Sequence, residues 1–301
     1  MPKTRRLIPV ALALILGLTS TSCLFTRRVI LRHKQKVTPG QAPKLLDATR
    51  DQLNMRIADS CNAIKSFQAK VDLTPSVGSV YTGQITEIKN VSAVVLFSKP
   101  ADMRILGYLP VVHSLAFDMV SNGETFKLSL VSKNLFIVGD NDAPPTSKNK
   151  FENLRPEAFL SSMLICPGDP AAEPALEDAT DEDDAIYILH FIKKGPDGKP
   201  MIARNVWFDR LDLTIVRQKV FDPSGSGAIV SDTRYSKWTA YNGVMFPAHI
   251  DINRDEDGYG LVLDVTDMKM NIELTDPGDK FILNQPPGST LQTIGAPGAP
   301  K

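Results

Sequence analysis

The sequence has no excess of charge of either sign, because lysine plus arginine and aspartate plus glutamate each number 34. Such a balance gives no electrostatic reason to expect nucleic acid as a partner. A Gly-x-Ser-x-Gly motif, a P-loop and a dinucleotide-binding fingerprint are all missing from it. Histidine is scarce, and His190 and His249 lack a metal-ligand spacing. We therefore predict no enzyme activity, no cofactor and no metal site.

The apolar run near the N-terminus is too short to span a membrane, which takes about 20 residues. It extends for 12 residues from Leu7 to Leu18, follows three basic residues, and is succeeded by four small residues and Cys23. This layout predicts a secretory signal peptide over residues 1–22.

The small residues directly before Cys23 resemble a lipobox, the pattern in which the cysteine becomes the new N-terminus and carries acyl chains. Ser20 stands where a leucine is usual. We expect Cys23 to be lipidated and to anchor the protein to the membrane. Two alternatives stay open: ordinary cleavage near Ser22, which would give a secreted protein, and an uncleaved membrane anchor.

Composition divides the rest of the chain into three parts. Residues 23–41 are basic and rich in helix breakers, which predicts a flexible tether, and residues 42–285 form the expected folded domain. Residues 286–301 are rich in proline, glycine and alanine, which predicts a disordered tail. Cys61 and Cys166 either pair in an oxidising compartment or remain as two buried free thiols.

Periodicity predicts the order of helices and strands. Apolar residues at three-, four- and seven-residue steps indicate one amphipathic helix over residues 42–67, and an apolar run after Pro156 indicates a short inserted helix. Elsewhere apolar and polar residues alternate between Asn-Gly and Asp-Gly turns, which is typical of an antiparallel meander. Residues 173–184 read as an acidic loop. The predicted strands are 85–97, 126–138, 185–192, 203–208, 213–221, 229–238, 246–253 and 261–272.

The predicted fold class is therefore mainly β with α, a large curved antiparallel sheet with an N-terminal helix and a short inserted helix. Such a sheet buries its concave face only if something fills it. The two apolar helices are the candidates for a lid over that face.

Three stretches of the sequence carry a family resemblance. In residues 97–105 a strand ends at a Lys-Pro pair and restarts with an arginine-containing strand. Residues 205–222 hold two strands and a turn at an aspartate, and residues 235–250 contain Asn-Gly, Phe-Pro and His-Ile pairs. Together with the lipobox-like Cys23, these stretches resemble the LolA/LolB-like lipoprotein-carrier superfamily over residues 42–285.

That resemblance implies an unclosed β-barrel whose mouth is covered by helices, with acyl chains held between them. It also implies lipid or lipoprotein trafficking by a protein that is lipid-anchored in the outer membrane and faces the periplasm. LolB-like members carry an apolar loop that protrudes towards the membrane. By sequence order the corresponding residues are Tyr108, Leu109, Pro110 and Val111. The alternative is that Leu109 and Val111 pack beneath the inserted helix.

We expect an apolar cavity between the sheet and the helices. The side chains available to line it from the sheet are Phe97, Ile105, Phe117, Trp207 and Phe221, although strand register decides which of them point inward. The lid would consist of Phe159, Leu160, Met163 and Leu164 with either Met55 or Ile57.

The expected partners are lipids or the acyl chains of lipoproteins. The alternative function is a sensor or assembly lipoprotein that uses the same fold to bind a protein partner. Such an interaction module would have a filled core and an exposed surface patch in place of an apolar cavity.

The Cys23→Ser substitution tests the predicted anchor. It should release the processed protein from the membrane fraction, because no acylated cysteine would then hold it there. Labelled fatty acid should enter the unaltered protein and not the variant. Equal labelling of both would contradict lipidation at Cys23.

Overall fold

A computed structural model describes residues 44–79, 81, 83–87, 90–141, 143, 156–181, 183–274 and 277–295. The chain divides into two units, residues 1–43 and 44–301, and every described residue belongs to the second. The predicted signal peptide, Cys23 and tether therefore lie outside the described residues.

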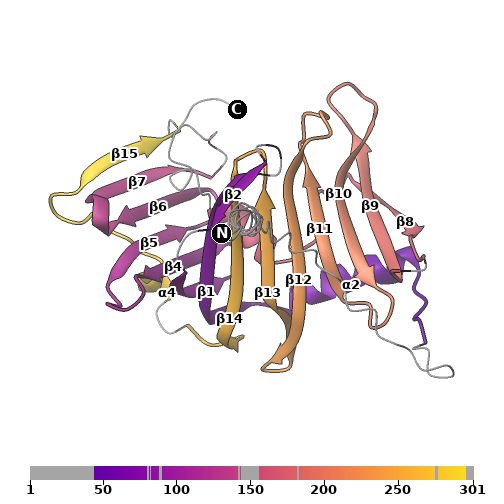
Figure 1. Ribbon diagram of the computed structural model, residues 1–301, viewed down its shortest axis with the longest axis horizontal. Helices are drawn as coiled ribbons and strands as arrows, with labels where there is room; N and C mark the ends of the chain where they lie inside the picture. Colours follow the sequence, from indigo (N-terminus) through magenta and orange to yellow (C-terminus); the bar gives the residue numbers. More distant parts are fainter. Residues whose placement is uncertain are drawn as a thin grey trace, which may run out of the picture. The chain divides into compact units, whose positions relative to one another are not determined.

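The described strands form one large mixed sheet that is not closed (Figure 1). Its order is β15-β7-β6-β5-β4-β3-β1-β14-β13-β12-β11-β10-β9-β8, with β2 paired to β1. Neighbouring strands are antiparallel, except for β15, which runs parallel to β7. The strands are β1 (Ser66–Ser79), β2 (Gln84–Glu87), β3 (Val91–Ser98), β4 (Asp102–Tyr108), β5 (Leu115–Ser121), β6 (Thr125–Leu130), β7 (Leu135–Asp140), β8 (Glu173–Asp178), β9 (Ile186–Lys194), β10 (Pro200–Asp209), β11 (Ile215–Phe221), β12 (Ile229–Tyr241), β13 (Val244–Arg254), β14 (Tyr259–Met270) and β15 (Thr290–Ile294).

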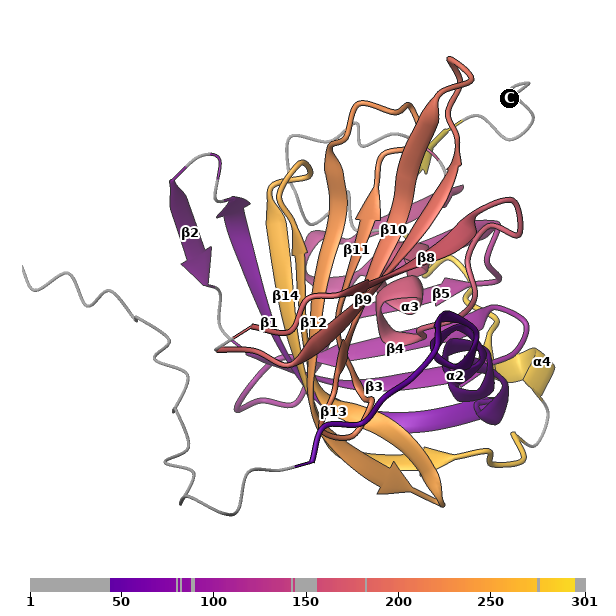
Figure 2. The same ribbon diagram turned by 90° about the vertical axis from the view of Figure 1, so that its right-hand side faces the viewer.

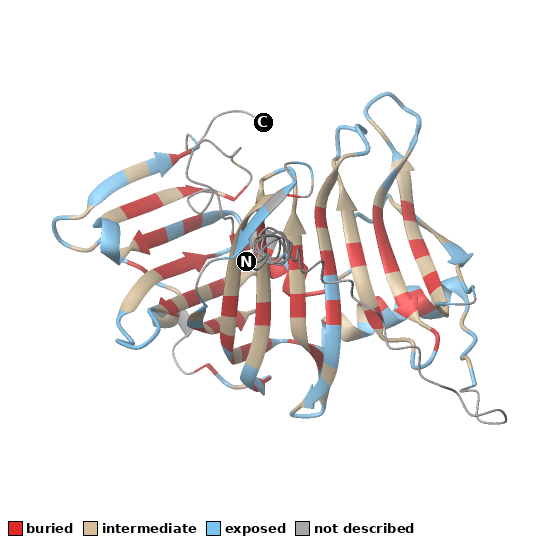
Figure 3. Cartoon of the chain, viewed as in Figure 1, coloured by how far each residue is buried: buried red, intermediate tan, exposed pale blue. Residues whose placement is uncertain are grey.

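Alternation along the strands places one apolar face against the core. In β3, Ala93, Val95 and Phe97 are buried while the residues between them are not, and β4 buries Met103 and Ile105 in the same way. The red bands in Figure 3 mark this alternation across the sheet. We call the face that carries this core the inner face.

The N-terminal helix is shorter than predicted. It is α2 (Arg50–Ala63), and a capping box at its start joins the Thr49 side chain to the Gln52 amide and the Gln52 side chain to the Thr49 amide. Phe67, predicted to lie in this helix, belongs to β1. The apolar spacing continues past the end of the helix, because Ile64 and Phe67 pack into the same core from an extended chain.

The inserted helix occurs where it was predicted, as α3 (Pro156–Met163). Proline suits a first helical turn because the amide that it lacks has no partner there. The other short helical segments are η2 (Val131–Lys133) and α4 (Pro277–Lys280).

The predicted secondary structure was wrong for three segments. The acidic residues 173–178 form the edge strand β8, which pairs with β9. The predicted strand 126–138 is a hairpin of β6 and β7, turned through η2 and left-handed Asn134. Residues 290–294 of the predicted tail form β15. For β8 and β15 a partner strand supplies hydrogen bonds that composition does not reveal, whereas residues 131–134 turn the chain and divide the predicted strand in two.

The outer face of β4 to β6 is covered by the chain after α4. Arg104 in β4 pairs with Asp118 in β5 and also donates to the Lys280 carbonyl. Leu283 packs against Val120 and Phe136 in a small second core. These contacts hold the chain between α4 and β15 against the outer face, and β15 then pairs with β7 at the edge of the sheet.

The helices α2 and α3 lie on the inner face (Figure 2). α2 contacts β8 and β9, and α3 contacts β5. A disulfide joins Cys61 at the end of α2 to Cys166 after α3, which decides between the two thiol states left open by the sequence. The cover over the inner face is therefore a pair of helices that are linked covalently.

Candidate ligand-binding site

The short helix α3 and the segment that follows it form the centre of the candidate site. Their apolar side chains, Phe159, Leu160, Met163, Leu164 and Ile165, are all buried in the main core. Tyr235 in β12 donates from its hydroxyl to the Ser162 carbonyl over 2.9 Å. Because α3 also contacts β5, it connects two distant parts of the same sheet.

Most of the predicted lining residues belong to the main core that also contains the α3 side chains. Phe97 and Ile105 belong to the same core as the α3 side chains, and so does Ile57 of α2, whereas Met55 is exposed. Phe117 is half-buried against that core. Its ring lies over Gly107, where a Cβ would come within 2.1 Å of a Phe117 carbon, so only glycine fits there.

Trp207 and Phe221 are placed differently from the prediction. Trp207 alternates with the buried Val206 and Phe208 and therefore lies on the outer face. The Arg217 guanidinium lies 5.2 Å from its ring centre, a cation–π contact on that face. Phe221 is half-buried at the end of β11 and lies outside the core cluster. Strand register, which the sequence did not settle, excludes Trp207 from the lining.

Sequence reasoning missed a group of polar residues on the inner face. They come from three adjacent strands and α3, and all are buried: Arg204 in β10, Gln218 in β11, Ser231, Thr233 and Tyr235 in β12, and Ser162 in α3. The sequence contained a signal for Arg204. It lies two and four residues before the core residues Val206 and Phe208, so alternation along the strand places its side chain on the same face.

Arg204 is the most unusual member of this group. Arg204 is only 8% exposed. Its cross-strand neighbours are Phe191 in β9 and Val220 in β11. Nη1 donates to the Cys166 carbonyl over 2.5 Å, whereas Nε and Nη2 are buried with no hydrogen-bond partner among the described residues. Burial lowers the pKa of Arg204 to about 10, so the group remains charged at neutral pH.

Of the predicted contact residues, Leu109, Pro110 and Val111 are exposed between β4 and β5, whereas Tyr108 is half-buried at the end of β4. Val111 is 92% exposed and Leu109 is 41% exposed, so the alternative that they pack beneath α3 is wrong. The Val112 amide donates to the Pro110 carbonyl, which places Val111 at the centre of a tight turn with φ of 73°. A β-branched residue is strained in that region, and the apolar side chain of Val111 lies in solvent.

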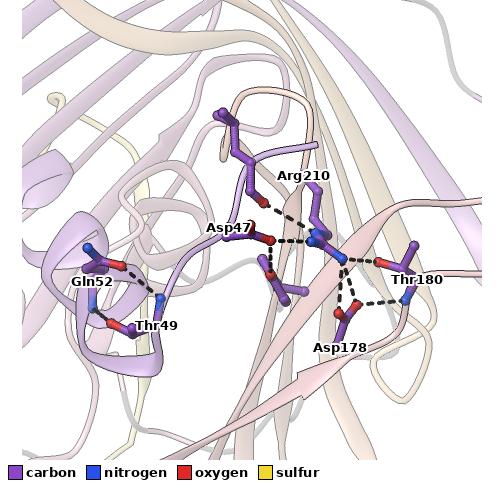
Figure 4. A network of polar contacts seen from close by, with 8 residues as sticks. Asp47, Thr49, Gln52, Asp178, Thr180 and Arg210 are labelled. Atoms are coloured by element: carbon purple, nitrogen blue, oxygen red, sulfur yellow. Dashed lines mark hydrogen bonds and ion pairs between the residues drawn. The ribbon is translucent and has the colours of Figure 1, made fainter. Parts of the chain in front are cut away.

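A polar network secures the start of the described chain (Figure 4). Buried Arg210, just after β10, binds Asp47 over 2.7 Å, Asp178 over 3.0 Å and Thr180 over 2.9 Å. It also lies 4.4 Å from the Tyr187 ring centre. We interpret this network as structural, because it joins the segment before α2 to strands β8 to β10.

Each of the two histidines in the strands forms a hydrogen bond with one acidic side chain. His190 lies 2.7 Å from Glu177, and His249 lies 2.7 Å from Asp264. Within the described ranges no cluster of three or more histidine, cysteine or acidic side chains is arranged to hold a metal ion. The same part of the chain contains no helix with the length and apolar character needed to cross a membrane.

No protein-family model matches the sequence, and no curated protein matches it. Solved structures do match the fold. A LolA superfamily protein from Nitrosomonas europaea is 16% identical, with a TM-score of 0.48 over 76% of this chain and 97% of that chain. A DUF1329 family protein from Desulfovibrio piger is 15% identical, with a TM-score of 0.48 over 74% of this chain and 92% of that one.

A third structure, from Vibrio parahaemolyticus, is provisionally described as an outer membrane lipoprotein-sorting protein domain. It is 10% identical, with a TM-score of 0.46 over 76% of this chain and 96% of that chain. These likenesses concern the arrangement of strands and helices, and we draw no functional conclusion from them.

Replacing Arg204 tests the energetic cost of its burial. Arg204→Met should raise the free energy of unfolding by about 1 kcal/mol or more, because it removes an unpaired buried charge and keeps most of the volume. Arg217→Met is the matched control and should lower it, because Arg217 is paired with Asp232. Chemical denaturation measures both. A less stable Arg204→Met protein would show that the described contacts already compensate the charge.

Proposed function

We propose that this protein is a lipid-anchored protein of the cell envelope that binds acyl chains, either free or on lipoproteins, between its inner face and α3. It does so without catalysis, and its task is lipid or lipoprotein trafficking at the outer membrane. The observation that carries the proposal is the incomplete cover: among the described residues, the apolar face of an unclosed sheet meets two helices, α2 and α3.

The size of that face supports a ligand role for it. α3 has eight residues, about 12 Å of helix at 1.5 Å per residue. The inner face as a whole includes strands as long as 14 residues, about 46 Å of extended chain. An acyl chain between α3 and the sheet would bury its methylenes at about 0.8 kcal/mol each.

The exposed residues 109–112, between β4 and β5, support contact with a membrane. Val111 and Val112 are among the most exposed large apolar side chains of the described chain. Membrane contact would bury these apolar side chains, which otherwise lie in water. The loop would then act together with the acylated Cys23 in keeping the domain at the membrane surface.

Tryptophan quenching by brominated palmitate tests where an acyl chain binds. One variant has Phe97→Trp on the inner face, with Trp207→Phe and Trp238→Phe. Its matched control keeps Trp207 on the outer face and has only Trp238→Phe. Bromine quenches on contact, so the tryptophan at position 97 should lose fluorescence and Trp207 should not. Failure to quench at position 97 would indicate a filled core and favour the protein-binding alternative.

Val111→Glu tests the loop. Because the side chain is exposed, stability should change by no more than about 0.5 kcal/mol. Cosedimentation with vesicles should fall for a chain that begins at residue 23 and carries Cys23→Ser, which removes the anchor's own contribution. Val131→Glu, at an exposed position in η2, is the matched control. Equal loss in both variants would argue against a specific loop contact.

A further inference from the structure

The two buried arginines of the described chain differ in their partners. Arg210 is surrounded by acceptors, including the carboxylates of Asp47 and Asp178. Arg204 donates through Nη1 alone, to a backbone carbonyl. Its Nε and Nη2 are shielded from solvent and have no acceptor among the described residues. A charged donor pair kept from water without an acceptor is costly, which calls for an explanation in function.

Two other arginines show what this edge of the guanidinium binds. Nε and Nη2 of Arg104 donate to the two oxygens of Asp118 over 2.9 and 2.6 Å. The same two nitrogens of Arg217 donate to the two oxygens of Asp232. In both pairs a carboxylate lies side-on against the Nε/Nη2 edge, the bidentate geometry that suits two planar groups.

The surroundings of Arg204 indicate what kind of carboxylate could approach. The Phe191 ring centre lies 5.6 Å from the guanidinium carbon, and Val220 is the cross-strand neighbour. The segment after α3 covers the group through the Cys166 carbonyl and Gly168. A small hydrophilic anion would lose its hydration here with no apolar contact in return. A carboxylate on a long apolar chain can bury the chain in the adjoining core.

We propose that the Nε/Nη2 edge of Arg204 binds the carboxylate of a free long-chain fatty acid, whose chain lies between α3 and the inner face. This inference rests on the proposed acyl-binding function and narrows it. Acyl chains on a lipoprotein are esters or amides without charge, so they give the guanidinium no counter-ion. The carboxylate would supply the acceptor pair that Asp118 and Asp232 supply elsewhere.

The test compares palmitate with methyl palmitate, which has the same chain and no charge. Binding of each ligand to the full chain is measured by its displacement of a fluorescent acyl probe. All proteins are measured in the same non-ionic detergent, so that each ligand partitions into the micelles to the same extent in every measurement. The unaltered protein should prefer palmitate by about 10- to 100-fold, the range expected for hydrogen bonds between charged groups. This comparison requires no variant to fold.

Three variants test whether the preference for palmitate over methyl palmitate depends on Arg204. Arg204→Met should bind both ligands with equal affinity, because only the carboxylate contact is lost. Arg204→Lys keeps the charge without the planar fork and should show an intermediate preference. Arg217→Met is the matched control, since its edge already holds Asp232 on the outer face, and its preference should equal that of the unaltered protein.

The outcomes separate this inference from the function on which it rests. Equal binding of both ligands by the unaltered protein would overturn the role of Arg204 and leave acyl binding intact. A palmitate preference that survives Arg204→Met would place the carboxylate elsewhere and also overturn it. Binding of neither ligand would overturn acyl binding, and the inference with it.

Discussion

The apolar face of an unclosed sheet has to be covered, and that requirement shapes the rest of this domain. Part of the cover is α3, which accepts a hydrogen bond from Tyr235 of β12 and contacts β5. One short helix therefore connects strands from separate parts of the sheet. The disulfide between Cys61 and Cys166 then links this helix to α2. Closing a loop of 105 residues restricts the unfolded chain, which favours the covered state.

The placement of charge follows the same division between faces. On the outer face Arg217 pairs with Asp232 and Arg104 pairs with Asp118, so each of these charges has a partner of opposite sign. The inner face holds Arg204 without a carboxylate partner in the described part of the chain. A fold selected for stability alone would have an apolar residue there, so the cost of Arg204 is reasonably explained by a ligand.

Side chains between α3 and the sheet are shielded from solvent in the described chain. Phe97 and Met163 are almost completely buried, so an acyl chain would reach them only if α3 moved. A helix of eight residues is a small unit to displace, and short elements open at lower free energy than the strands beneath them. The carboxylate contact at Arg204 and the buried methylenes would together offset the lost packing.

Periodicity and turn signals in the sequence were enough to predict a β-rich domain with an inserted helix at Pro156, because those patterns act over a few residues. The family resemblance singled out Leu109 and Val111, which the structure exposes. Long-range pairing decided the rest. It turned acidic residues 173–178 into an edge strand and added residues 290–294 to β7. Register, set between strands far apart in sequence, put Trp207 outside and Arg204 inside, and only the folded sheet could show that difference.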